Sequence, residues 1–148
     1  CEEDILAEKE RLVKIGRLTQ AQSEGVDLRS VKDFFSSDIY RRIKKADCVY
    51  RERQFTMAES IGKLDKMIPA EFSEEKTVVI GKTDLIFTEN GAAVIVDYKT
   101  DKVEDISALR ARYKEQMEMY TEAVGRSLGL TVKECILYSI RLRSYITV

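Results

Sequence analysis

An Asn-Gly pair between two strand-like runs constrains the fold of this chain more than any other feature. Asn90-Gly91 separates the runs 78–89 and 92–99, which are rich in valine, isoleucine and threonine. Both central residues of a type I′ turn need a positive φ, which asparagine and glycine adopt at low cost. The sequence therefore predicts a hairpin with Glu89 opposite Ala92. Counting back along both strands, this register places Asp84 opposite Asp97.

Three charged side chains are expected on one face of this hairpin. Asp97 and Lys99 are two positions apart, so they point the same way, and the register places Lys82 opposite Lys99. Directly opposed residues have Cβ atoms about 4.5 to 5.5 Å apart, where the like charges of Asp84 and Asp97 repel. A hard divalent cation between the two carboxylates would reverse that repulsion. The pattern thus favours a site for Mg²⁺, with Mn²⁺ as a substitute.

The lysine gives this metal site a chemistry. An ammonium beside a bound cation stabilises negative charge on a phosphoryl oxygen and orients an attacking water. Asp84, Asp97 and Lys99 together predict phosphodiester hydrolysis. Two alternatives remain open at this stage. One is a pair of exposed strand aspartates without a site, and the other is a two-carboxylate glycosidase, whose carboxyl groups are about 5 to 5.5 Å apart in retaining enzymes.

Composition narrows the classes of protein. A length of 148 residues fits a single domain, 1–148, and no apolar run approaches the roughly 20 residues of a membrane span. The absence of histidine excludes His-based triads within this chain, and the net charge of -1 provides no overall basic footprint for nucleic acid. The three cysteines are widely separated, which favours a reducing, cytoplasmic setting. Because the first residue is Cys1, we expect a fragment of a longer protein.

The periodicity predicts an α/β fold, a mixed β-sheet flanked by helices. Helices are expected over 2–15, over 27–46 with a break at Ser36-Ser37, and over 105–128 with Gly129 as the stop. Strands are expected over 48–57, 135–140 and, at the sheet edge, 145–148, with a connector over 58–76. In the first strand, alternation places Val49 and Phe55 on one face and Glu52 on the other. Glu52 is a weak candidate for the site.

Three motifs resemble one family. "GKTDLIF" resembles a G-x-x-D strand, "VIVDYKTDK" resembles a D-Y-K-T strand, and "YKEQMEMYTEA" resembles a Q-x-x-x-Y helix. They are similar to the motifs of RecB-type PD-(D/E)XK nucleases, most closely the AddA-type nuclease domains of bacterial AddAB helicase-nucleases. Steps of three and four place Tyr113, Gln116 and Tyr120 on one face of a helix. "YRERQF" also resembles an R-E-x-P-F strand of this family, with Gln54 in place of the proline.

The resemblance implies a restriction-endonuclease-like fold and a Mg²⁺-dependent DNA exonuclease. It implies that Asp84 and Asp97 bind metal, that Lys99 is catalytic, and that Gln116, Tyr120 and Tyr113 position DNA. The implied partners are single-stranded DNA fed by a helicase, the helicase domains of a parent chain, and a second, AddB-like subunit, in double-strand break repair and recombination. The family's metal-site histidine has no match here, so we expect it upstream of Cys1. The alternative is an inactive domain of the same fold that guides DNA or docks a partner.

Overall fold

The computed structural model describes residues 2–148, and Cys1, with the expectations attached to it, lies outside them. Five helices and one 3-10 turn accompany the long helix α6 (Ser107–Leu128). They are α1 (Glu2–Lys14), α2 (Gln20–Glu24), α3 (Leu28–Ser36), α4 (Asp38–Lys45), α5 (Ile61–Leu64) and η1 (Ala70–Phe72). The strands are β1 (Cys48–Ser60), β2 (Lys76–Glu89), β3 (Ala92–Lys99), β4 (Val132–Ser139) and β5 (Ser144–Thr147).

The five strands form one mixed sheet in the order β1-β2-β3-β4-β5, with β5 at the edge as expected. All neighbours are antiparallel except β3 and β4, which α6 connects as a parallel crossover. The turn between β2 and β3 has φ of 54° at Asn90 and 75° at Gly91. Glu89 pairs with Ala92, so the predicted hairpin and its register are confirmed.

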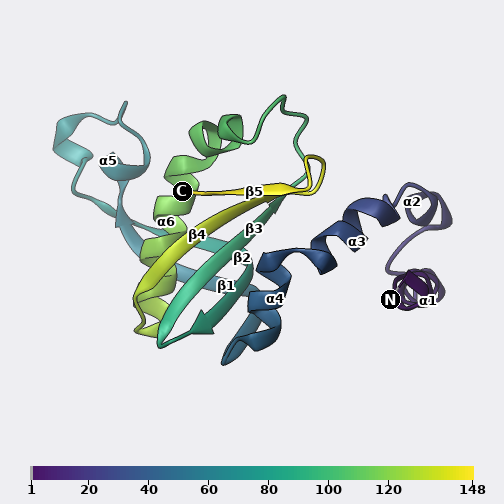
Figure 1. The fold of residues 1–148 in the computed structure, drawn as a ribbon. Coiled ribbons are helices and arrows are strands. Elements are labelled where there is room, and N and C mark those ends of the chain that lie inside the picture. The colour runs from purple at the N-terminus through teal and green to yellow at the C-terminus, as the bar shows by residue number, and fades with distance from the viewer. Residues whose placement is uncertain (1) are drawn as a thin grey trace.

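Helices cover both faces of this sheet, as predicted (Figure 1). Helices α3 and α4 pack on one face, where Ile39 and Ile43 meet Phe87 and Tyr138. Helix α6 packs on the other face, where Leu109, Met117 and Val124 contact the β3 and β4 side chains Ile95, Cys135 and Leu137. Because Asp97 and Lys99 alternate with Ile95 along β3, they belong to the α6 face.

Local signals in the sequence explain where the helices end. Ser37 accepts a hydrogen bond from the backbone N–H of Tyr40 and begins α4, which confirms the expected break after α3. Gly129 ends α6 with φ of 64°, the left-handed conformation that favours glycine. Helices α1 and α2 lie beyond the far end of α3, away from the sheet (Figure 1). Within residues 2–148, every helix is too short or too polar to span a lipid bilayer.

The expected continuous alternation in the first strand is wrong at Glu52. This residue has φ of 49°, a left-handed conformation that interrupts the pleat. Before it, Val49 packs on the α4 side, and after it Phe55 packs against Ala123 of α6. The strand also continues to Ser60, so β1 and β2 form a long ribbon. The predicted connector is shorter and contains α5 and η1.

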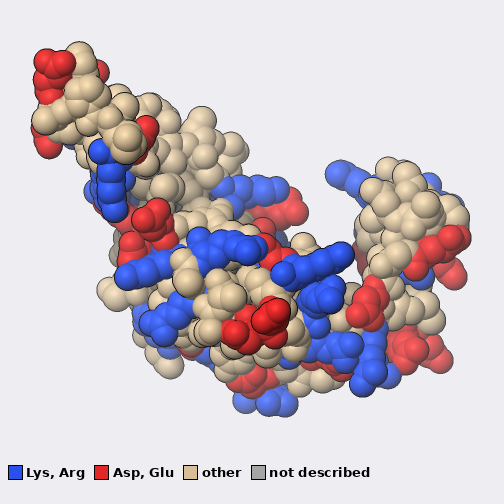
Figure 2. Space-filling model, turned by 90° about the horizontal axis from the view of Figure 1, so that it is seen from above, with Lys and Arg blue, Asp and Glu red and all other residues tan. Residues whose placement is uncertain are grey.

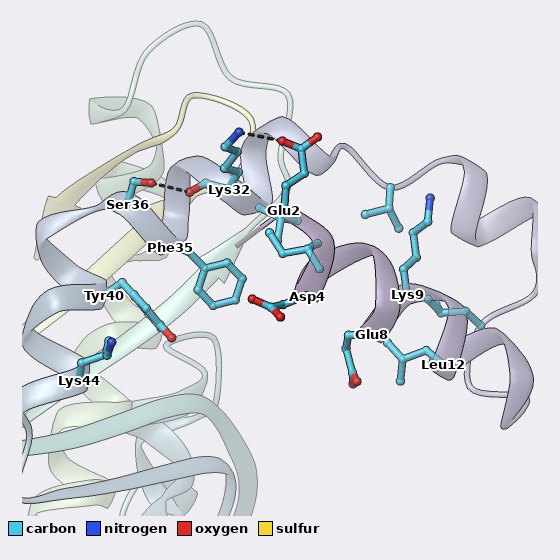
Figure 3. Close-up of a pocket in the computed structure, with 14 residues that line it drawn as sticks. Glu2, Asp4, Glu8, Lys9, Leu12, Lys32, Phe35, Ser36, Tyr40 and Lys44 are labelled. Atoms are coloured by element: carbon cyan, nitrogen blue, oxygen red, sulfur yellow. Dashed lines mark hydrogen bonds and ion pairs between the residues drawn. The ribbon is translucent and has the colours of Figure 1, made fainter.

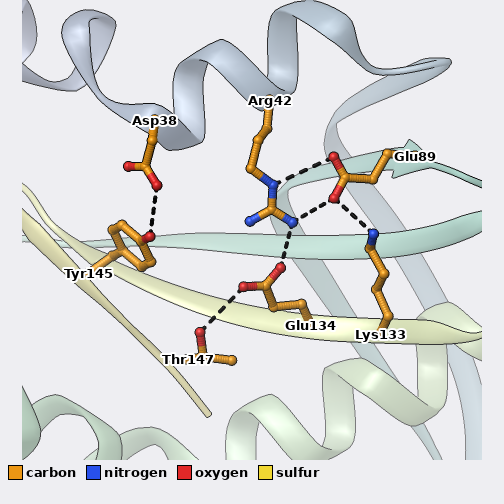
Figure 4. Close-up of polar contacts among 7 residues, drawn as sticks. All are labelled: Asp38, Arg42, Glu89, Lys133, Glu134, Tyr145 and Thr147. Carbon is orange, nitrogen blue, oxygen red and sulfur yellow. Dashed lines mark hydrogen bonds and ion pairs between the residues drawn. The ribbon is translucent and has the colours of Figure 1, made fainter.

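A network of charged side chains fixes α4 to the sheet (Figure 4). The Arg42 guanidinium donates to Glu89 at 2.6 Å and to Glu134 at 2.5 Å, and Lys133 lies 2.9 Å from Glu89. Arg42 also lies over the Phe87 ring, 5.4 Å from its centroid. These partly buried, charge-assisted contacts join α4, β2 and β4.

We expect Glu89→Gln to lower the free energy of unfolding by about 1 to 2 kcal/mol at pH 7. Hydrogen bonds from Arg42 and Lys133 lower the pKa of Glu89 from 4.5 to about 2. The unfolded chain takes up this proton near pH 4.5, so the stabilisation is complete above that pH and disappears as the pH falls to about 2. Urea unfolding at pH 7 and pH 3 measures this. The exposed Glu118→Gln is the control, and an equal loss at both pH values would contradict the account.

Candidate active site

The hairpin ladder ends where the two aspartates begin. Its last pair is Leu85 with Val96, and the next positions are Asp84 and Asp97. There the Asp84 carboxylate accepts a hydrogen bond of 2.8 Å from the backbone N–H of Tyr98. A side chain therefore replaces the next ladder bond and carries the Asp84 carboxylate to the end of β3. The register predicted this meeting, but not the bond to Tyr98.

Asp97 is a buried carboxylate with one cationic neighbour. Its side chain is 5% exposed, and its Oδ2 lies 2.8 Å from Lys99 Nζ. The angle of this ion pair is not that of a hydrogen bond, so Oδ2 has no hydrogen-bond partner among residues 2–148. Burial raises the pKa of Asp97, Lys99 opposes that rise, and the nearby charge of Asp84 adds to it. A buried acceptor in this state is suited to bind a cation.

The Lys99 ammonium is held from three sides. Besides Asp97, it donates to Gln116 Oε1 at 3.1 Å and lies 3.7 Å from the centroid of the Tyr113 ring. Gln116 in turn donates to the Tyr120 hydroxyl at 2.8 Å. Only 12% of the Lys99 side chain is exposed. The structure thus brings the predicted helix stripe of α6 onto the predicted hairpin cluster.

A further acidic residue, Asp101, lies in the loop after β3 and was not singled out by the sequence analysis. Its carboxylate accepts from the Tyr113 hydroxyl at 2.9 Å and from Arg112 at 2.7 Å. The only sequence signal is its place two residues after Lys99. Contacts between a loop and a helix side chain have no periodicity, so sequence reasoning had no means to find this one.

Two other charged residues of the ribbon do not join the cluster. Glu52 is 75% exposed on its side chain and lies 3.3 Å from Lys82. Lys82 pairs with Gln54 of β1, not with Lys99, because the β2–β3 ladder has already ended. The expected position of Lys82 opposite Lys99 is therefore wrong. Glu52 is a neighbour of Lys82 at the surface of the β1–β2 ribbon.

The donor set fits a hard divalent cation. Asp84 and Asp97 offer carboxylate oxygens on one patch, and Asp97 Oδ2 is buried without a hydrogen bond from the described residues. Among residues 2–148, no group of three His, Cys, Asp or Glu side chains gathers in a metal-binding arrangement. Mg²⁺ commonly binds through one or two carboxylates and completes its shell with water and phosphate oxygens. Two aspartates are therefore a sufficient protein contribution.

A separate groove of about 730 Å³ lies between α1 and the α3–α4 pair (Figure 3). Leu12 and Phe35 give it apolar walls, and Lys32 contacts Glu2 at 2.8 Å on its rim. This groove contains none of the residues of the carboxylate cluster. Its size therefore carries no argument about the chemistry at Lys99.

Comparison with known proteins agrees with this geometry. A sequence model described as the PD-(D/E)XK nuclease superfamily matches residues 4–143. The chain belongs to this superfamily. The five-stranded mixed sheet flanked by helices is consistent with the restriction-endonuclease-like fold of PD-(D/E)XK nucleases, which confirms the predicted fold class.

Several relatives of this PD-(D/E)XK chain are named as the first subunit, of type A, of an ATP-dependent helicase/nuclease. The protein from Clostridium kluyveri is 34% identical over 92% of the chain, and that from Alkaliphilus oremlandii is 36% identical over 93%. The protein from Clostridium botulinum strain 657 is 33% identical over 99%. The chain covers 11 to 12% of the length of these relatives. The similarity thus concerns a small part of each of them.

Proposed function

We propose that this chain is the nuclease domain of a helicase-nuclease and hydrolyses DNA with Mg²⁺. The observation that carries the proposal is the buried Asp97 carboxylate, beside Asp84 and 2.8 Å from the Lys99 ammonium. The superfamily match and the relatives' names support a nuclease. Exonuclease action, the choice of Mg²⁺ over Mn²⁺, and a role in double-strand break repair and recombination extend this proposal.

Each site residue has a proposed role in the reaction. Asp84 and Asp97 hold the cation, which when bound would polarise the scissile phosphate and lower the pKa of a bound water. Lys99 stabilises negative charge on a phosphate oxygen, and its low exposure strengthens that interaction. Gln116 orients Lys99 by accepting its hydrogen bond, and Tyr120 holds Gln116 in place. Tyr113 and Tyr120 also offer rings on which DNA bases can stack.

The surface around the site supports contact with a phosphate backbone. Figure 2 shows Lys and Arg side chains, interspersed with Asp and Glu, across the middle of the face on which the β3–α6 loop lies. Local positive charge of this kind attracts nucleic acid even when the net charge is -1. We infer single-stranded DNA as the substrate, delivered by helicase domains of a longer parent chain and a second, AddB-like subunit, in the cytoplasm.

Cleavage of end-labelled single-stranded DNA tests this function. The 148-residue chain and a longer form that includes the preceding segment are each incubated with Mg²⁺, Mn²⁺ or EDTA. We expect metal-dependent shortening of the DNA, lost in Asp84→Asn, which keeps an acceptor for Tyr98 but lacks the charge. Cleavage that persists in EDTA would contradict the proposal. DNA binding without cleavage in both forms would instead identify an inactive guiding domain.

A further inference from the structure

Asp101 is the one acidic residue beside this cluster that the proposed chemistry does not use, among those that the structure describes. It lies in the loop that leaves β3, and it contacts two neighbouring side chains of α6, Arg112 and Tyr113. The Tyr113 hydroxyl bond, with help from Arg112, holds the pKa of Asp101 below its usual range. Its carboxylate is therefore a charged acceptor, which makes the bond to Tyr113 stronger than a neutral one.

The Tyr113 ring needs such a bond to stay where it is. Its face lies 3.7 Å from Lys99 Nζ, a cation–π contact that depends on both distance and ring orientation. A tyrosine ring on a helix rotates about two side-chain bonds, and packing against the sheet covers only part of it. A hydrogen bond at the far end of the ring removes much of that freedom. The loop after β3 thereby determines how the helix presents its ring to the lysine.

We propose that Asp101 is a positioning residue that holds the Tyr113 ring over the Lys99 ammonium. It touches neither the reacting atoms nor the aspartates, and it acts through the ring. The effect on catalysis rests on the proposed nuclease function, whereas the effect on the geometry of Lys99 does not. The ring keeps the ammonium directed at the carboxylates, together with the hydrogen bond from Lys99 to Gln116.

Two readouts test this role in the 148-residue chain. The first is the NMR shift of the Lys99 Hε protons, which the Tyr113 ring moves upfield of those of the exposed Lys102. The second is the rate of Mg²⁺-dependent DNA cleavage. We expect Asp101→Ala to move the Lys99 signals toward those of Lys102 and to slow cleavage about fivefold. Asp101→Asn retains an acceptor oxygen, so it should keep both properties near the wild type.

Tyr113→Phe supplies a second variant that keeps the ring and removes only its hydroxyl. It should reproduce both effects of Asp101→Ala, and the double variant should be no worse than either single one. Unchanged Lys99 signals in Asp101→Ala or, where that variant does not fold, in Tyr113→Phe would overturn the proposal. So would additive losses, or an Asp101→Asn variant as impaired as Asp101→Ala. A wild type that cuts no DNA but shows the expected signals would refute the nuclease function and leave the positioning role of Asp101 standing.

Discussion

Replacing Lys99 by alanine is expected to slow Mg²⁺-dependent DNA cleavage by about 10²- to 10³-fold. The ammonium lies 2.8 Å from Asp97 Oδ2 in a site that is largely closed to water, so no solvent cation can take over its role. Metal binding should be retained or become tighter, because the variant removes a positive charge beside the carboxylates. Single-turnover cleavage and calorimetric titration with Mn²⁺ measure these two effects separately.

Lys102→Ala is the matched control for this prediction. Lys102 is an exposed lysine three residues further along, so it has the same charge without the contacts of Lys99. Its removal should change the cleavage rate no more than about twofold, through weaker attraction of DNA. Equal rates for Lys99→Ala and the wild type would remove the lysine from the mechanism.

The second large effect is expected from Gly81→Val in β2. A Cβ atom at this glycine would lie 2.3 Å from Cζ of Phe55, whose ring is buried and packed between β2 and α6. That ring cannot move freely, because it also meets the Tyr120 ring at 5.5 Å. We expect a loss of about 1 to 3 kcal/mol in the free energy of unfolding. Cleavage should fall too, since Tyr120 holds Gln116.

Chemical unfolding and cleavage assays with two further variants test this explanation. Lys82→Val changes the next residue of the same strand, where the side chain is exposed, and should be nearly neutral. Phe55→Leu in the Gly81→Val background should recover part of the lost stability, because a smaller side chain leaves room for the valine. A Gly81→Val protein as stable as the wild type would show that the ring can move aside.

The meeting of the two aspartates with Lys99 could be predicted because it follows from strict rules. A two-residue turn at Asn90-Gly91 admits one register, and strand alternation then determines which side chains share a face. The stripe of Tyr113, Gln116 and Tyr120 follows equally from helix periodicity. The direction of that stripe toward Lys99 was implied by the family resemblance.

Other parts of the site could not be predicted because they depend on local exceptions to those rules. Glu52 adopts a left-handed φ although it is not a glycine, and this shifts Phe55 to the α6 face. Asp84 replaces a ladder bond with its side chain, which ends the pairing before Lys82. Asp101 meets Tyr113 through a loop whose path has no periodic signal. Each exception is a tertiary contact between segments that are independent in sequence.

The central claim, that Asp84 and Asp97 hold a divalent cation beside Lys99, is tested most directly by titrating the 148-residue chain with Mn²⁺ in a calorimeter. We expect saturable binding to the wild type and none to Asp97→Ala, with Asp105→Ala, an exposed aspartate of the next loop, behaving as the wild type. Circular dichroism of each variant checks that the fold is retained. Absence of binding to the wild type, or equal binding to Asp97→Ala, would contradict the account.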